Sequence, residues 1–141
     1  MNIGLKSFLV ALSLFSSCGY AAMKDYDKYF SQVIINNFAY GVYNSGGKET
    51  QYFCIGIKRG DETLPLNVVC KFDLFGNHKQ GFQEMMDIAK YHYATGDRIR
   101  VYYKEPVWTD ADFVNAFSNG ELIALTSCSS DTYCMGPTKK N

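Results

Sequence analysis

The feature that most limits the fold is an even set of cysteines in a short exported chain. Lys6, an apolar run from Phe8 to Phe15 and the mostly small residues Gly19-Tyr20-Ala21-Ala22 predict a signal peptide over residues 1–21, with cleavage near 21/22. The apolar run is too short to span a bilayer. Cys18 lies in this segment, so four of the five cysteines stay in the mature chain. An even number in a small secreted protein favours disulfide bonds formed in an oxidising compartment.

An alternative interpretation makes Cys18 the acylated first residue of a lipoprotein. The residues before it, Phe15-Ser16-Ser17, are a poor match to the sequence that precedes an acylated cysteine.

The mature chain, residues 22–141, is expected to form a single domain, since this length suits one modest core and is too short for two.

Charge and aromatic content narrow the class of ligand. The sequence has 14 basic and 14 acidic side chains, and residues 1–21 contain only Lys6, so 13 basic and 14 acidic side chains remain, a net charge of −1. This balance does not supply the basic surface that nucleic-acid binding needs. The 11 Tyr and 10 Phe suit exposed binding surfaces, although barrel cores also use many aromatic side chains.

The first part of the mature chain has the pattern of β-structure. Runs of β-branched and aromatic residues predict strands over Val33–Tyr43, Gln51–Lys58 and Leu66–Phe72. Turn-forming residues at 44–47 separate the first two runs. The two strands are therefore expected to form a long hairpin.

One helix interrupts the strands. Apolar residues at helical spacing predict it over residues 79–95, and Gly96 supplies its C-terminal stop. Met85, Ile88 and His92 form a second, weaker apolar stripe. Such a stripe indicates either a subunit contact or a wide core face.

After the helix the chain returns to β-structure. Strands are predicted over Arg98–Lys104 and Glu121–Ser127, with a helical turn over Asp112–Phe117 between them. Five strands around one mid-chain helix follow the order of an OB-fold barrel. The predicted fold class is therefore mainly β with one central helix, an OB-fold barrel.

The four mature cysteines could form two bridges, of which one would staple the barrel. If Cys54 and Cys70 lie on neighbouring strands, a bridge between them closes a loop of about 17 residues and contributes on the order of 3 kcal/mol. Cys128 and Cys134 are separated by five residues, so a local bridge between them would hold the C-terminal tail rather than the barrel.

Six stretches of the chain, taken together, identify a protein family far more specifically than any one of them does alone. They are Tyr52–Ile55, Tyr93–Lys104, Val107–Thr109, Phe113–Asn115, Leu125–Cys128 and Cys134–Pro137. Together they resemble the pertussis-like B subunits of AB5 toxins, over about Tyr29 to Pro137 and with all four mature cysteines in order.

The resemblance implies a function and a set of partners. A member of this family is the receptor-binding component of a secreted bacterial toxin, so we expect export through the periplasm and assembly as a ring-forming homopentamer. The ring would bind sialylated host glycoproteins or glycolipids and carry an enzymatic toxin A subunit on one face. Its central helices would line the axis, which would account for the second apolar stripe.

The resemblance also implies a sugar site near the mature N-terminus. Ser31 follows Tyr29-Phe30 at the position of the family's serine that receives the sialic acid carboxylate. A carboxylate held at a protein surface needs short hydroxyl and N–H donors. Asp27 matches an acidic sugar-contacting position of the family, and Tyr29 matches an aromatic one. Outside the family, a serine at a strand start is usually a solvated edge residue.

Three further residues are assigned to the site by the resemblance. Arg59 matches a sugar-binding lysine and Arg100 an arginine, and either can donate to hydroxyls or a carboxylate. Tyr103 stands at a specificity position, where a hydroxyl would meet the extra oxygen of N-glycolylneuraminic acid. Strand alternation places Arg100 and Tyr102 on one face and Tyr103 on the other, so Tyr103 needs a bulge or a strand end to reach the site. Pro65 replaces a polar threonine of the family.

The sequence offers no catalytic set. The two histidines, His78 and His92, are not paired with a serine or cysteine nucleophile, and bridged cysteines leave no thiolate for catalysis or metal. Asp110 and Asp112 lack the glycine-turned loop of a calcium site and are expected to cap the helical turn. We therefore expect no enzyme activity, no metal and no cofactor.

Two other functions fit the same fold. One is a secreted structural adaptor that docks an A subunit without binding glycans. The other is an OB-type module that binds single-stranded nucleic acid through tyrosine and arginine, which export and the near-zero charge disfavour.

Overall fold

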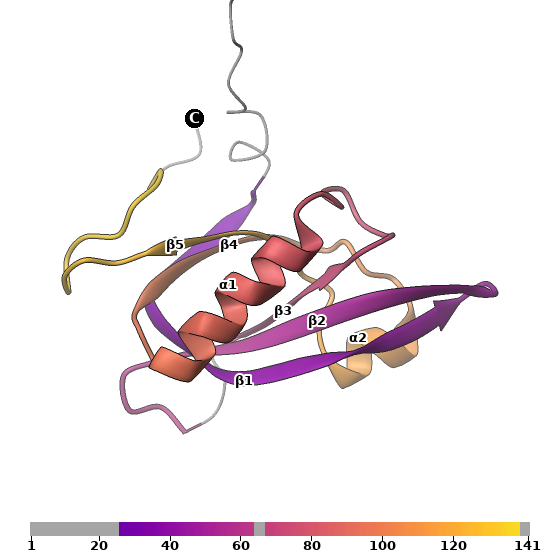
Figure 1. The fold of residues 1–141 in the computed structure, drawn as a ribbon, viewed down its shortest axis with the longest axis horizontal. Helices are drawn as coiled ribbons and strands as arrows, with labels where there is room; N and C mark the ends of the chain where they lie inside the picture. Colours follow the sequence, from indigo (N-terminus) through magenta and orange to yellow (C-terminus); the bar gives the residue numbers. More distant parts are fainter. Residues whose placement is uncertain (1–25, 64–66, 139–141) are drawn as a thin grey trace, which may run out of the picture.

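The computed structural model describes residues 26–63 and 67–138. The predicted signal peptide and Pro65 lie outside this part of the chain. The elements follow one another as β1 (Lys28–Ser45), β2 (Lys48–Arg59), β3 (Asn67–Phe72), α1 (Phe82–Thr95), β4 (Ile99–Lys104), α2 (Ala111–Ala116) and β5 (Glu121–Ser127) (Figure 1).

The strands close into a barrel in the order β1-β2-β3-β5-β4. All neighbouring pairs are antiparallel except β3 and β5, which are parallel. Closure depends on β1, which pairs with β2 along its C-terminal part and with β4 along its N-terminal part. The predicted mainly β barrel with one central helix is confirmed.

Local sequence signals account for the main turns. At the tip of the predicted β1–β2 hairpin, Gly46 and Gly47 have φ of 60° and 79°, which glycine adopts without steric cost. The Asn44 side chain accepts a hydrogen bond from the Gly47 N–H at 3.1 Å. Helix α1 ends at Gly96, as predicted, with φ 70° and an N–H that donates to the His92 carbonyl.

Helix α1 contributes one face to the barrel core and leaves another exposed. Phe82, Met86 and Ala89 are buried in the main core cluster with residues from all five strands. Ile88 and Tyr91 stay 47% and 61% exposed. The second predicted stripe is therefore divided, since Met85 packs against the core and Ile88 faces outward. Among the described residues, no helix is long and apolar enough to cross a membrane.

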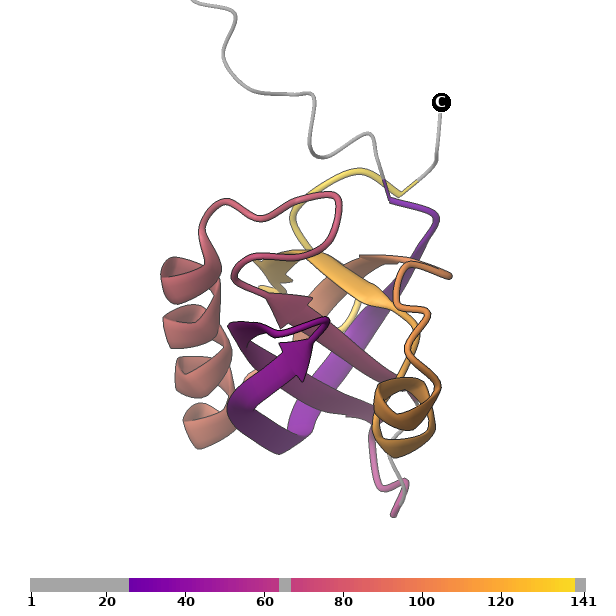
Figure 2. The same ribbon diagram turned by 90° about the vertical axis from the view of Figure 1, so that its right-hand side faces the viewer.

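A second cluster lies on the other side of the barrel. The Cys54–Cys70 disulfide joins directly paired residues of β2 and β3, as predicted, and packs with Phe72, Trp108 and Phe113. Figure 2 shows α1 and α2 on opposite sides of the barrel. The cluster around the disulfide therefore anchors α2.

Asp110 caps α2, as the sequence predicted. Its side chain accepts a hydrogen bond from the Phe113 N–H at 3.0 Å. A hydrogen bond from Tyr43 and the backbone N–H groups hold the pKa of Asp110 below its usual value. The hairpin tip is thereby joined to α2.

Two buried charged side chains order the loop before α1. Lys71 and Glu121 are 1% and 0% exposed. The Glu121 carboxylate accepts hydrogen bonds from the N–H groups of Asn77 and His78, both at 3.1 Å, and Lys71 donates to the His78 carbonyl. Burial lowers the pKa of Lys71, and the Glu121 charge partly offsets this effect.

Candidate functional site

The site begins with a β-bulge near the start of β1. Phe30 pairs with Val101 of β4 and Val33 pairs with Ile99, so Ser31 and Gln32 together oppose the single residue between those partners. That residue is Arg100. The extra residue shifts the inward–outward alternation of the side chains by one position. Val33, three residues after the core-facing Phe30, therefore also points into the barrel and is fully buried.

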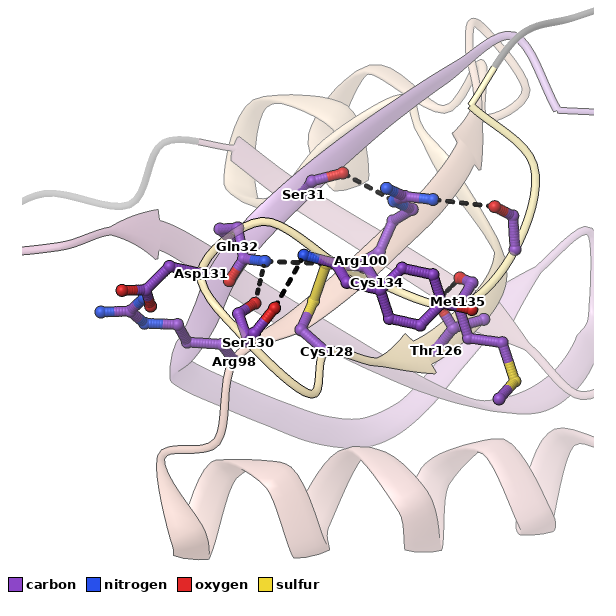
Figure 3. The surroundings of a disulfide bond; sticks show 12 residues. Ser31, Gln32, Arg98, Arg100, Thr126, Cys128, Ser130, Asp131, Cys134 and Met135 are labelled. Atoms are coloured by element: carbon purple, nitrogen blue, oxygen red, sulfur yellow. Dashed lines mark hydrogen bonds and ion pairs between the residues drawn. A yellow bond between two sulfur atoms is a disulfide. The ribbon is translucent and has the colours of Figure 1, made fainter.

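The bulge brings Ser31 to Arg100. Arg100 Nε donates a hydrogen bond to Ser31 Oγ at 2.6 Å (Figure 3). Because this oxygen accepts the arginine proton, the hydroxyl proton of Ser31 can be donated to another acceptor. An anion at this position would meet a hydroxyl donor beside a guanidinium charge.

Arg100 is held in place from several sides. It is 5% exposed, and its Nη1 donates to the Gly136 carbonyl at 3.0 Å and to the Tyr102 hydroxyl at 3.4 Å. The guanidinium carbon lies 5.2 Å from the centre of the Tyr29 ring, within the range of a cation–π contact. The Tyr29 hydroxyl donates to the Thr138 carbonyl at 2.6 Å. Three of the predicted residues, Ser31, Tyr29 and Arg100, therefore lie together.

The C-terminal segment forms one wall of this site. Figures 1 and 2 both show it beside the start of β1. The Cys128–Cys134 disulfide closes a short loop after β5, as predicted. The Gln32 amide, Nε2, donates to the Ser130 carbonyl at 2.6 Å and to Cys134 Sγ at 3.3 Å. Arg98 pairs with Asp131 on the exposed side of the same loop (Figure 3).

The remaining predicted residues lie elsewhere. Arg59 is placed over the ring of Phe30, with its guanidinium carbon 6.0 Å from the ring centre. Tyr103 stacks on the same ring at 5.5 Å and is 2% exposed, and this burial raises its pKa. Strand alternation thus keeps Tyr103 on the core side of β4, away from Arg100, and the bulge in the β4–β5 pairing after Tyr102 does not change this.

Asp27 lies immediately before β1, which begins at Lys28, and is bonded to the end of β4. Its N–H donates to the Tyr103 carbonyl at 3.0 Å, and its carboxylate accepts from the Glu105 N–H at 3.3 Å. The side chain is exposed. It stands two residues before Tyr29, next to the site rather than in it.

Gln32 and the carbonyls of residues 136–138 were not among the predicted site residues. Nothing in the local sequence marks a bulge at Ser31 and Gln32, since neither residue is a glycine and the predicted strand began only at Val33. The one available signal was the predicted bridge between Cys128 and Cys134, which indicated that the C-terminal tail is held in place.

Within residues 26–63 and 67–138, no three His, Cys, Asp or Glu side chains gather where they could hold a metal ion. What the site offers is a hydroxyl, a fixed guanidinium and an aromatic ring. A hydroxyl beside a fixed positive charge and an aromatic ring suits an anionic, partly apolar ligand.

The chain is similar to toxin components of known structure. No family model matches it. It is 32% identical over 115 residues to the B subunit of subtilase cytotoxin from Escherichia coli, across 81% of this chain and 77% of that protein. It also matches a mutant PltB homopentamer of Salmonella typhi solved with Neu5Ac-α-2,3-Gal-β-1,4-GlcNAc glycans, with a TM-score of 0.73, 30% identity and coverage of 84% of this chain and 98% of that chain.

A second solved structure gives the same result. It describes the assembly of subtilase cytotoxin SubAB, and the match has a TM-score of 0.69, 30% identity and coverage of 82% of this chain and 98% of that chain. The similarity thus extends over almost the whole length of each solved chain.

Proposed function

The chain belongs to the B subunits of AB5 toxins, which are non-catalytic, and on this basis we propose that it binds sialylated host-cell glycans as the receptor-binding component of a secreted toxin. In this proposal the mature chain forms a homopentamer, carries an enzymatic A subunit, and reaches the outside through the periplasm. The match to a PltB homopentamer with sialylated glycans supports the ligand and the ring. The match to the SubAB assembly supports the A subunit as partner.

The observation that carries the proposal is the 2.6 Å hydrogen bond between Arg100 and Ser31. It presents a hydroxyl that can donate a hydrogen bond to a carboxylate, with a positive charge behind it. Sialic acid is the terminal sugar with such a carboxylate. A hydrogen bond to a charged group contributes about 1.5–3 kcal/mol, more than one between neutral groups.

Tyr29 completes this part of the proposed site. Its ring is positioned by Arg100 on one side and by the hydroxyl's bond to Thr138 on the other. A fixed aromatic face beside a carboxylate-binding hydroxyl can pack against the apolar side of a sugar. Asp27, at the edge, would accept hydrogen bonds from sugar hydroxyls.

Arg59 and Tyr103 are proposed contacts of a different kind. Both gather at Phe30, on the other face of β1 from Ser31. A glycan extending over the end of β1 would reach the exposed Arg59 first, and Tyr103 only through its hydroxyl. We therefore place the carboxylate at Ser31 and assign these two residues to the periphery.

Assembly converts weak single sites into useful affinity. A ring of identical protomers presents several copies of the site to one cell surface, and multivalent engagement raises the overall affinity by about 10²–10⁴ without any new contact. Single-site affinity is therefore the quantity that tests the site.

The experiment is the Ser31→Ala substitution, with binding of a monovalent sialyl-N-acetyllactosamine measured by titration calorimetry. Loss of the hydroxyl should weaken binding about 10- to 150-fold. Ser45→Ala is the matched control, because Ser45 lies exposed at the far end of the same strand. Native mass spectrometry should give the same oligomer for all three proteins.

Two results would contradict the proposal in different ways. Equal glycan affinity in Ser31→Ala would show that the carboxylate binds elsewhere. A wild-type pentamer that associates with its A subunit and binds no sialylated glycan would favour the structural adaptor instead.

A further inference from the structure

The residue next to Ser31 connects the glycan site to the C-terminal disulfide loop. We propose that Gln32 is a positioning residue for glycan binding, and that the loop closed by Cys128 and Cys134 holds Ser31 and Arg100 in their binding geometry. This inference rests on the proposed function of the site at Ser31.

The backbone of Gln32 has an unfavourable conformation. Its φ is 59°, and among residues 26–63 and 67–138 it is the only residue other than glycine with a positive φ. Side chains with a Cβ rarely adopt this region, and they remain there only where the surroundings hold them. The conformation is also what creates the bulge, because Gln32 is the second of the two residues opposite Arg100.

The Gln32 side chain supplies the restraint. Its Nε2 donates both to the Ser130 carbonyl at 2.6 Å and to Cys134 Sγ at 3.3 Å, so the amide is bonded to the middle of the disulfide loop and to its closing cysteine (Figure 3). Its Oε1 is buried without a hydrogen-bond partner. An apolar side chain of the same size would avoid this unpaired oxygen, so packing alone does not explain the glutamine.

The same segment holds the other half of the site. The Gly136 carbonyl, two residues after Cys134, accepts the hydrogen bond from Arg100 Nη1 at 3.0 Å. Contacts therefore run in a closed circuit, from Ser31 through Gln32 to Cys134, on to Gly136, and back through Arg100 to Ser31. Any opening of the loop would loosen the positions of the hydroxyl and the guanidinium together.

This role is separate from the stability of the barrel. The Cys128–Cys134 bridge lies after β5 and joins residues outside the named strands. The barrel has its own bridge, Cys54–Cys70, which is fully enclosed between β2 and β3. Opening the terminal loop is therefore expected to change glycan affinity more than it changes unfolding or assembly.

The test is a double-mutant cycle on the assembled pentamer. One variant is Gln32→Met, which keeps the length of the side chain and removes the amide donor. The second is Cys128→Ala with Cys134→Ala, and the third combines all three substitutions. Monovalent sialyl-N-acetyllactosamine is titrated into each, with Gln51→Ala, an exposed glutamine on β2, as the matched control.

We expect the first two variants each to lose about tenfold in affinity and the control to remain within about twofold of wild type. Because both changes act through the bonds between the Gln32 amide and the disulfide loop, the affinity of the combined variant should be at most about twofold below that of the weaker single variant. A merely destabilising role would instead lower the melting temperature and give losses that multiply. The cysteine variant leaves Gln32 in place, so it tests the contact even if Gln32→Met fails to assemble.

Wild-type binding separates the two levels of the proposal. If the wild type binds the glycan and Gln32→Met binds it equally well, or if the losses multiply, the positioning role is overturned and the proposed function stands. If the wild-type pentamer binds no sialylated glycan, both are overturned.

Discussion

The Arg100→Lys substitution keeps the positive charge beside Ser31 and removes the planar fork that holds it. In the structure, Nε and Nη1 of one rigid group donate to Ser31 Oγ at 2.6 Å and to the Gly136 carbonyl at 3.0 Å. The ammonium group of lysine is a compact charge and cannot hold both acceptors in this geometry. The substitution therefore separates the contribution of shape from that of charge.

The expected loss follows from the bonds that Arg100 makes. Arg100 is 5% exposed, so water cannot easily replace a lost partner. Loss of one hydrogen bond involving a charged group costs about 1.5–3 kcal/mol, which corresponds to about 10- to 150-fold in glycan affinity. The cation–π contact with Tyr29 would weaken as well, because the charge moves relative to the ring.

The assay is a titration of the pentamer with monovalent sialyl-N-acetyllactosamine at low and at high salt. Salt weakens the attraction between exposed charges and affects short, enclosed hydrogen bonds much less. We expect Arg100→Lys to bind weakly at both salt concentrations. Arg98→Lys is the matched control, since lysine keeps a positive charge that can pair with Asp131 on the exposed side of the loop. A control affinity within about twofold of wild type is expected.

The result that would refute this reasoning is an Arg100→Lys pentamer with wild-type affinity and the same salt dependence. Charge alone would then account for any role of Arg100. The geometry of the Ser31–Arg100 pair would not explain recognition of the carboxylate.

Two further predictions concern the fold that supports the site. Replacing both Cys54 and Cys70 by Ala removes the barrel's bridge, whose cysteines are separated by 16 residues in the sequence. The free energy of unfolding should fall by about 3 kcal/mol and the melting temperature by about 10–15 °C, as measured by calorimetry in oxidising buffer. A shift in melting temperature below about 2 °C would argue against a stabilising role for this bridge. The hydrogen bond to Asp110 raises the pKa of Tyr43 to about 12, so its contribution to stability is complete below pH 10.0 and is lost as the pH rises through about 12. Asp110→Asn keeps a good helix cap and should lower the pKa of Tyr43 toward 10.0, which NMR of the tyrosine ring carbons would follow; an unchanged pKa would mean that burial dominates the shift.

Much of the barrel could be predicted because its signals are local. The hairpin depends on glycines at its turn, the end of α1 on Gly96, and the cap of α2 on Asp110. Each of these residues acts within a few positions along the chain. The strand and helix patterns are equally local, and the predicted strand over Glu121–Ser127 has the same bounds as β5.

The start of β1 shows where this kind of prediction stops. The predicted strand began at Val33, whereas β1 begins at Lys28 because its first residues pair with β4. This pairing partner lies about seventy positions later in the chain, as the separation of 69 between Ser31 and Arg100 illustrates. No pattern within residues 28–32 could indicate it.

The chain's own order of residues is sufficient to determine the class of fold, the two bridges and the face of β4 on which each side chain lies, since these depend on spacing and on alternation. The meeting of Ser31 with Arg100, and of Gln32 with the loop 98 positions away, depends on how distant strands are registered when the barrel closes. A one-residue bulge changes which side chains face each other without leaving a mark in the local sequence. The candidate site is therefore a property of closure, because its donors on β1 and β4 and its acceptors in the C-terminal segment come within hydrogen-bonding distance only in the complete barrel.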